Sequence, residues 1–155
     1  MEAEAREAAF VGFARDLEPR LRAALVVRFG PVRGREAAAE ALAWGWEHWE
    51  RLEGVGNRGG FLYRVGCRRA LRWRWSRPLL PASETVEEAW VEPQLGAALA
   101  SLTLMQRQAV VLIEGYGLTY GEAAELLGVT RSTVQIHVAR GLTRLRRALG
   151  VVSDV

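Results

Sequence analysis

The chain has 155 residues, 50% of them hydrophobic and 25% charged, which is enough for one domain or for two small ones. Its 21 Lys and Arg residues outweigh 18 Asp and Glu residues to give a formal net charge of +3, and every one of these cations is an arginine because the sequence contains no lysine. The single Cys67 excludes an internal disulfide, and no apolar run approaches the roughly 20 residues that a membrane-spanning helix needs.

The N-terminal stretch MEAEAREAAF has early acidic residues and lacks the basic-then-apolar order of a signal peptide. We therefore expect a cytoplasmic protein that does not insert into a membrane. A long helix is predicted over Glu2 to Phe29, because Phe10, Phe13, Leu17, Leu21 and Leu25 form an apolar stripe. Pro19 lies inside this stretch, so a kink or a break is expected there. Gly30 and Pro31 end it.

A second helix, rich in alanine, is predicted over Arg35 to Leu52. Its three tryptophans are interpreted as core or interface anchors in preference to groups that stack on nucleic-acid bases. The following stretch GVGNRGG is a loop that does not end in Lys-Ser/Thr, which argues against a phosphate-binding loop.

A third helix, FLYRVGCRRALRWRWS, is predicted over Phe61 to Ser76, and it contains no acidic residue. Trp73 and Trp75 alternate with arginines near its end, a pattern typical of surfaces that track a nucleic-acid strand and stack on its bases. The alternative is a solvated helix end, where cations are favoured by the helix dipole.

Composition changes after residue 76. Residues 77–94 are predicted to be a linker, because prolines and glutamates are frequent there. Helical signals return over Leu95 to Glu114. The sequence therefore predicts an all-α fold with two small helical domains, residues 1–76 and 95–150, joined by a linker that contains Pro and Glu.

The stretch LTYGEAAELLGVTRSTVQIHVARGLTRLRR carries the strongest local signals. Thr119 and Glu122 have the spacing of a capping box, and Gly128 is placed to end the helix that they begin. Thr130 can cap a second helix from Arg131, in which one apolar face is formed by Val134, Val138, Leu142 and Leu145. This order predicts a helix-turn-helix.

The opposite face of that second helix favours DNA binding. No acidic residue occurs from 131 to 149. Arginine can bind guanine edges, glutamine can bind adenine edges, and Ser and Thr suit phosphates or bases. The alternative is an ordinary helical hairpin with a solvated basic face.

No catalytic constellation emerges from the sequence. His48 and His137 are far apart, and Cys67 has no surrounding motif, so it is interpreted as a small buried apolar residue and not as a redox sensor. We expect no enzyme activity, no cofactor and no metal site.

The C-terminal motifs identify the chain as resembling the bacterial sigma-70 family, in particular its small extracytoplasmic-function group. LTLMQRQAVVL is similar to the family's LPPRQREVLVL, GLTYGEAAELLGV to GLSYAEIAELLGI, and TVQIHVARGLTRLR to TVKSRLARALARLR. In the family this module, region 4, holds the minus-35 promoter element. The resemblance implies minus-35 contacts by Thr119, Tyr120, Arg131, Ser132, Thr133, Gln135, Ile136, His137, Arg140 and Arg144.

The N-terminal resemblance is looser but follows the same order. FLYRVGCRRAL resembles the family's WLYRIARNLAL, which binds and opens the minus-10 element, and GREAAAEALAWGW resembles DAEDLVQEVFLRAW, which docks on the clamp of the largest polymerase subunit. Ala37 and Ala39 stand where the family usually has acids. The resemblance implies minus-10 contacts by Arg64, Arg68, Arg69, Arg72, Trp73 and Arg74. It implies polymerase contacts by Glu36, Glu40, Leu42 and Trp46.

The resemblance thus implies a sigma factor whose partners are promoter DNA and RNA polymerase core, through the clamp and the flap of the second-largest subunit. Such factors are commonly held inactive by an anti-sigma factor, although no residue here identifies one. The alternative is a stand-alone helix-turn-helix regulator that does not recruit polymerase. The missing clamp acids favour that alternative, whereas Glu40, Trp46 and the two-module layout oppose it.

Overall fold

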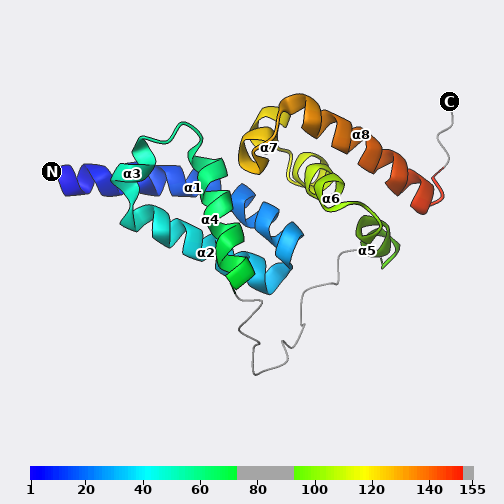
Figure 1. The fold of residues 1–155 in the computed structure, drawn as a ribbon, viewed down its shortest axis with the longest axis horizontal. Helices are drawn as coiled ribbons and strands as arrows, with labels where there is room; N and C mark the ends of the chain where they lie inside the picture. The colour runs from blue at the N-terminus through cyan, green and yellow to red at the C-terminus, as the bar shows by residue number, and fades with distance from the viewer. Residues whose placement is uncertain (73–92, 152–155) are drawn as a thin grey trace, which may run out of the picture. The chain divides into compact units, whose positions relative to one another are not determined.

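The computed structural model describes residues 1–72 and 93–151, which form helices and their connections without a strand among them (Figure 1). The predicted all-α fold is confirmed. Contacts divide the chain into two compact units, one with Met1–Ser76 and Glu125–Gly128, the other with Arg77–Ala124 and Val129–Val155. Trp73, Arg74 and most of the proposed linker lie outside the described residues, and the proposed domain limits stay a prediction.

The first unit is built on α1 (Glu2–Phe29), which continues through Pro19 as one helix. A break, one of the two alternatives expected at Pro19, is therefore wrong, and the other alternative, a kink, stays a prediction. Proline removes one backbone hydrogen bond, but the residues on either side of it, Leu17, Leu21 and Leu25, are buried in the core and hold both halves of the helix. Tertiary packing overrides the local signal.

Helix α2 (Pro31–Glu47) starts four residues earlier than predicted, immediately after Gly30. Proline suits the first helical position, where its missing N–H would have no partner, and Gly30 adopts the positive φ of 87° that the sharp connection requires. The two helices then meet closely at Gly34, where a Cβ atom would lie 2.5 Å from the backbone N and Cα atoms of Val26.

The predicted helix over Arg35 to Leu52 is in fact two helices, because α2 ends at Glu47 and α3 (Trp49–Glu53) follows His48. His48 stacks on Trp44, with 4.4 Å between ring centroids, and its Nδ1 lies 2.9 Å from the Trp44 carbonyl oxygen. The break turns Trp49 inward to 2% exposure against Phe10 and Phe13, which confirms its interpretation as a core anchor. Trp46 stays 41% exposed.

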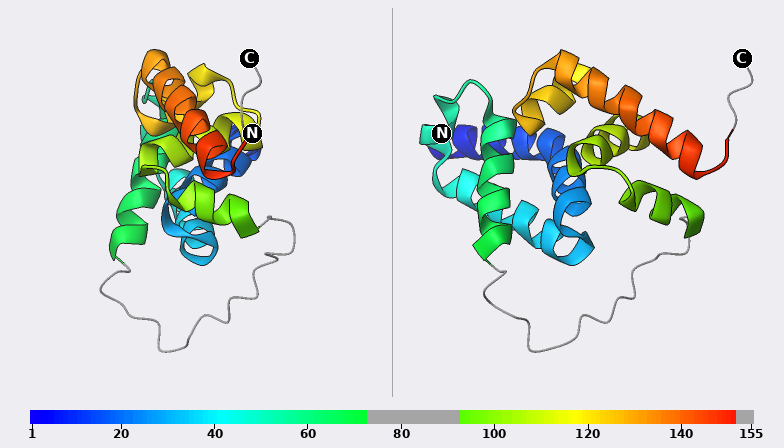
Figure 2. Two further views of the ribbon diagram at one scale, coloured as in Figure 1. Left: turned by 90° about the vertical axis from the view of Figure 1, so that its right-hand side faces the viewer. Right: turned by 45° about the vertical axis from the view of Figure 1, so that its right-hand side comes forward.

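Helix α4 (Arg58–Arg72) packs against α1 and α2 and closes the first unit (Figure 2). Its inward side includes Leu62, Tyr63 and Cys67, which are all buried. The Arg28 Nη1 atom lies 3.3 Å from the Tyr63 hydroxyl and 3.5 Å from the Cys67 Sγ. Burial raises the pKa of the Cys67 thiol, and the Arg28 charge offsets this only in part. The predicted buried cysteine is confirmed.

The second unit contains α5 (Pro93–Ala100), α6 (Leu104–Val110), a π-helical turn (Val111–Gly115), α7 (Tyr120–Leu127) and α8 (Arg131–Ala148). The stretch predicted as helical from Leu95 to Glu114 is interrupted, because Thr103 and Gln106 form a complete capping box that starts α6. Helix α8 packs on α5 and α6. The hydrophobic core cluster of the second unit consists of Ala98, Leu102, Val110 and Leu145.

The close contact at Gly34 yields the first prediction. Gly34→Ala should lower the free energy of unfolding by about 1–3 kcal/mol, because the added methyl group meets backbone atoms that cannot move aside as a side chain could. The measurement is urea unfolding followed by tryptophan fluorescence.

The matched control is Gly12→Ala in α1, where a Cβ atom would meet nothing within 4 Å. This variant should stabilise the protein by about 0.5–1 kcal/mol, since alanine has the higher helix propensity. Equal effects of the two substitutions would show that α1 and α2 separate at Gly34 without cost.

Candidate nucleic-acid interface

The helix-turn-helix begins with the predicted capping box at α7. The Thr119 N–H donates to Glu122 Oε2 at 2.8 Å, and the Glu122 N–H donates to Thr119 Oγ1 at 3.1 Å. This prediction is confirmed. Thr119 stays exposed and Tyr120 is half-buried at the start of the helix, where the helix dipole favours a phosphate group.

The turn between the two helices depends on Gly128, whose φ is 68°. Because L-residues rarely adopt this conformation, the predicted glycine stop is the residue that the turn requires. Thr130 then caps α8 as predicted, since its Oγ1 accepts the Thr133 N–H at 3.2 Å. The same Oγ1 lies 3.0 Å from the Ser132 hydroxyl and 2.8 Å from the Thr133 hydroxyl, so these polar groups form one network at the helix start.

Helix α8 has a buried side and an exposed side, as the sequence predicted. Val134, Val138 and Leu145 are buried, and Leu142 is half-buried against them. On the other side, His137 and Thr133 are half-buried, with the His137 Nδ1 atom covered and lacking a hydrogen-bond partner. The remaining predicted contact residues of α8 are exposed: Arg131, Ser132, Gln135, Ile136, Arg140 and Arg144.

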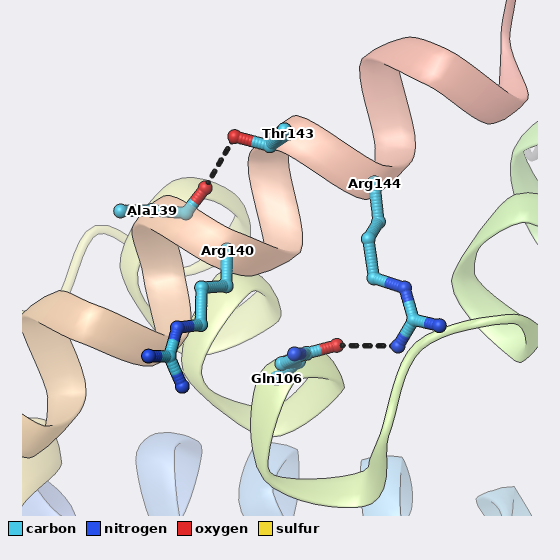
Figure 3. A pocket seen from close by; sticks show the side chains of 5 residues that line it. All are labelled: Gln106, Ala139, Arg140, Thr143 and Arg144. Carbon is cyan, nitrogen blue, oxygen red and sulfur yellow. Dashed lines mark hydrogen bonds between the residues drawn. The ribbon is translucent and has the colours of Figure 1, made fainter.

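Two contacts from α6 fix α8. A Cβ atom at Gly141 would lie 2.6 Å from Val110 Cγ2, so the helices are as close as a glycine permits. In addition, Arg144 Nη1 donates to Gln106 Oε1 at 3.4 Å across an open pocket of about 420 Å³ (Figure 3). Arg140 also extends from α8 and lines this pocket. One donor of Arg144, a residue predicted to contact DNA, is thus already bound to Gln106 within the protein.

Arg107 is a structural residue that the sequence reasoning missed. Its Nε donates to the Leu99 carbonyl at 3.0 Å, and its Nη2 donates to the Ala100 and Leu102 carbonyls at 3.3 and 3.4 Å. Leu99 and Ala100 are the last two residues of α5, and Leu102 follows that helix. Carbonyls at the end of a helix are short of partners within the helix, although the Leu99 carbonyl also accepts the Leu102 N–H at 3.1 Å. The available signal was its place directly after the Thr103–Gln106 capping box.

In the first unit, arginines of α4 line a groove of about 190 Å³ together with aromatic residues. Trp44, Phe61 and Val65 form part of its wall. The cations around it are Arg51, Arg68, Arg69 and Arg72. Arg51 belongs to α3. Its position in this groove results from tertiary packing and could not be predicted from the sequence of α4. Arg64 is exposed one turn earlier, with its guanidinium 5.8 Å from the Phe61 ring centroid.

Residues predicted to bind DNA and residues predicted to bind polymerase meet in one ion pair. Arg69 Nη1 lies 3.7 Å from Glu40 Oε2, and both side chains are partly exposed. Glu36 and Trp46 are exposed on α2, whereas Leu42 is half-buried. The outward side of α2 also carries Val32, Ala39 and Ala43; with Glu36 and Trp46, we call these residues the α2 face.

Within the described ranges, no group of three or more His, Cys, Asp or Glu residues is placed to hold a metal ion. None of the described helices combines the length and the apolar character that crossing a membrane requires.

Residues 93–145 match the family model of sigma-70, region 4. This part of the chain is therefore similar to region 4 of the sigma-70 family. The matched stretch runs from α5 into α8 and includes α7, the turn and most of α8. A comparison with curated proteins gives no match.

Among solved structures, the chain is similar to the sigma factor RpoE from Bartonella quintana, which was crystallised with the anti-sigma factor NepR. The TM-score is 0.61 at 22% sequence identity, and the match covers 92% of this chain and 98% of that one. This likeness extends the resemblance in fold beyond the region 4 match to the first unit.

The contacts of Arg107 lead to a second prediction. Arg107→Met should lower the free energy of unfolding of the second unit by about 2 kcal/mol, because it removes charge-assisted hydrogen bonds to three carbonyls while keeping an unbranched side chain. Thermal unfolding followed by circular dichroism measures this loss.

Arg146→Met provides the matched control, since Arg146 is an exposed arginine in the last turn of α8. Its removal should change stability by no more than about 0.5 kcal/mol. If the two variants were equally stable, the Arg107 contacts would contribute nothing to the fold.

Proposed function

We propose that this protein is a sigma factor of the extracytoplasmic-function group, which binds RNA polymerase core and directs it to promoters. The observation that carries the proposal is the acid-free exposed face of α8, held outward by buried apolar packing in a region 4 helix-turn-helix. Its action is binding without covalent chemistry, and its place of action is the cytoplasm, where the polymerase is found.

The second unit would hold the minus-35 element by placing the N-terminal half of α8 in the major groove. Arg131 and Gln135 are exposed there and have the donors that read guanine and adenine edges. Arg140 and Arg144 lie further along the helix and suit phosphates, with Arg144 already oriented by Gln106. Thr119 and Tyr120, at the start of α7, would contact the phosphate backbone of the DNA.

The first unit would engage the minus-10 element through α4. The groove beside Trp44 and Phe61 joins cations for phosphates to aromatic rings on which unpaired bases can stack. Strand opening would then be driven by capture of single-stranded bases. Arg64, Arg68 and Arg72 are exposed for this role, whereas Arg69 would have to exchange its Glu40 partner for DNA.

The α2 face would dock on the clamp of the largest polymerase subunit, and the second unit would contact the flap of the second-largest one. The RpoE structure contains an anti-sigma factor, and we infer that a protein of this kind also regulates this chain. A stand-alone regulator remains the competing hypothesis, since Ala39 leaves the α2 face with few charges.

Run-off transcription on a GC-rich genomic promoter library with bacterial core polymerase tests the proposal. Adding the protein should produce specific transcripts, and the double variant Arg131→Ala with Gln135→Ala should abolish them, because each lost base contact removes about 1–3 kcal/mol of discrimination. If the protein binds DNA duplexes in a salt-sensitive way but does not bind core polymerase, the sigma factor hypothesis is wrong and the stand-alone regulator is favoured.

Docking through α2 is tested separately by Ala43→Arg, which places a bulky charge on the α2 face. Capture of core polymerase should fall at least tenfold, while duplex binding stays unchanged. Ala97→Arg, an identical change at an exposed position of α5 in the other unit, serves as the control. Equal capture with both variants would mean that the α2 face does not touch polymerase.

A further inference from the structure

Ile136 is the one large apolar side chain that α8 exposes, at 49% of its surface. It belongs to the second turn of the helix, and its neighbours one turn away in either direction, Ser132 and Arg140, are exposed polar residues. Gln135 lies beside it in the chain and is exposed as well. An exposed β-branched residue adds nothing to helix propensity, so stability alone does not account for it.

The surroundings of Ile136 do not fit a protein-docking surface. A stable protein interface buries about 800 Å² on each partner and has a continuous apolar centre. Here one large apolar side chain, with only the small Ala139 exposed near it, stands among a hydroxyl group, an amide and a guanidinium group. The exposed apolar surface of Ile136 matches the size of a single methyl group on a partner.

The major groove offers such a partner. Thymine alone among the four bases presents a C5-methyl group on the groove floor, next to the hydrogen-bonding edges that polar side chains read. On a recognition helix, the first two turns reach these edges. Ile136 shares those turns with Arg131 and Gln135, while the buried Val134 and Val138 keep it turned outward.

We propose that Ile136 determines part of the promoter specificity by packing on the methyl group of a thymine in the minus-35 element. The inference rests on the proposed function and specifies its DNA ligand: a thymine at a position adjacent to the base pair that Gln135 contacts. The contribution is hydrophobic and therefore does not depend on phosphate neutralisation.

Deoxyuridine scanning tests this directly, because deoxyuridine keeps every hydrogen-bonding group of thymidine and lacks only the methyl group. Duplexes are first selected from a pool with a randomised minus-35 segment, using the full chain assembled with core polymerase. Each thymine of the selected segment is then replaced by deoxyuridine, one at a time, and affinity is measured at fixed salt. One replacement should weaken binding about fourfold, the value for burial of one methyl-sized group at about 0.8 kcal/mol.

The variant Ile136→Ser should bind the thymine duplex about fourfold more weakly and should not distinguish thymine from deoxyuridine at that position. Ile136→Val, which keeps a branched apolar end, should retain most of the discrimination. The control Val11→Ser alters another exposed β-branched residue, 44% exposed in α1, and should leave the whole deoxyuridine profile unchanged.

The outcomes separate this inference from the proposed function. Selection of a sequence and transcription from it, without a deoxyuridine effect or with an effect that persists in Ile136→Ser, would overturn the role of Ile136 and leave the sigma factor intact. A selected segment without thymine would do the same. Failure to select any sequence with core polymerase would overturn both, and reduced core capture by Ile136→Ser would reassign the residue to a protein contact.

Discussion

The close packing of α8 on α6 at Gly141 determines how the rest of the second unit works. A helix turns by roughly 100° at each residue, so placing position 141 against Val110 also sets the directions of all other α8 side chains. Val134, Val138 and Leu145 then face the core, and Gln135, Ile136 and Arg140 face solvent. The directions of the side chains that we propose to contact DNA thus depend on apolar contacts on the opposite side of the helix.

Arginines that look equivalent in the sequence have four different environments. Arg107 donates hydrogen bonds to carbonyls at the end of α5, and Arg144 donates one to Gln106. Arg69 is paired with Glu40. Arg131, Arg140 and Arg68 are exposed, so the cations free for DNA are fewer than a count of the basic runs implies. Each anchored arginine still contributes positive potential, but its geometry is set by the protein and not by the ligand.

The helix-turn-helix could be predicted almost residue by residue because its signals are local. Thr119 with Glu122, Gly128, and Thr130 each act within four residues of themselves, and all three behave as predicted. The break at His48 could not be predicted, since neither glycine nor proline marks it and a ring stacked on Trp44 takes their place. Arg51 entered the α4 groove only through tertiary packing. Contacts between distant segments, such as Glu40 with Arg69, leave no pattern in a single sequence.

The structure also changes the weight of the missing acids on α2. Ala37 is 3% exposed and packed in the α1–α2 core, so an acid there would face a desolvation penalty and would not reach a partner. Only Ala39, which is exposed, represents a lost surface charge. Of the two positions where the family usually has acids, one therefore bears on polymerase docking. What remains on the α2 face is largely apolar, with Val32 and Trp46 as its most hydrophobic members. Docking through this face would depend on apolar burial, whereas the proposed promoter binding would depend on arginines and phosphates, so the two interactions would respond in opposite ways to salt.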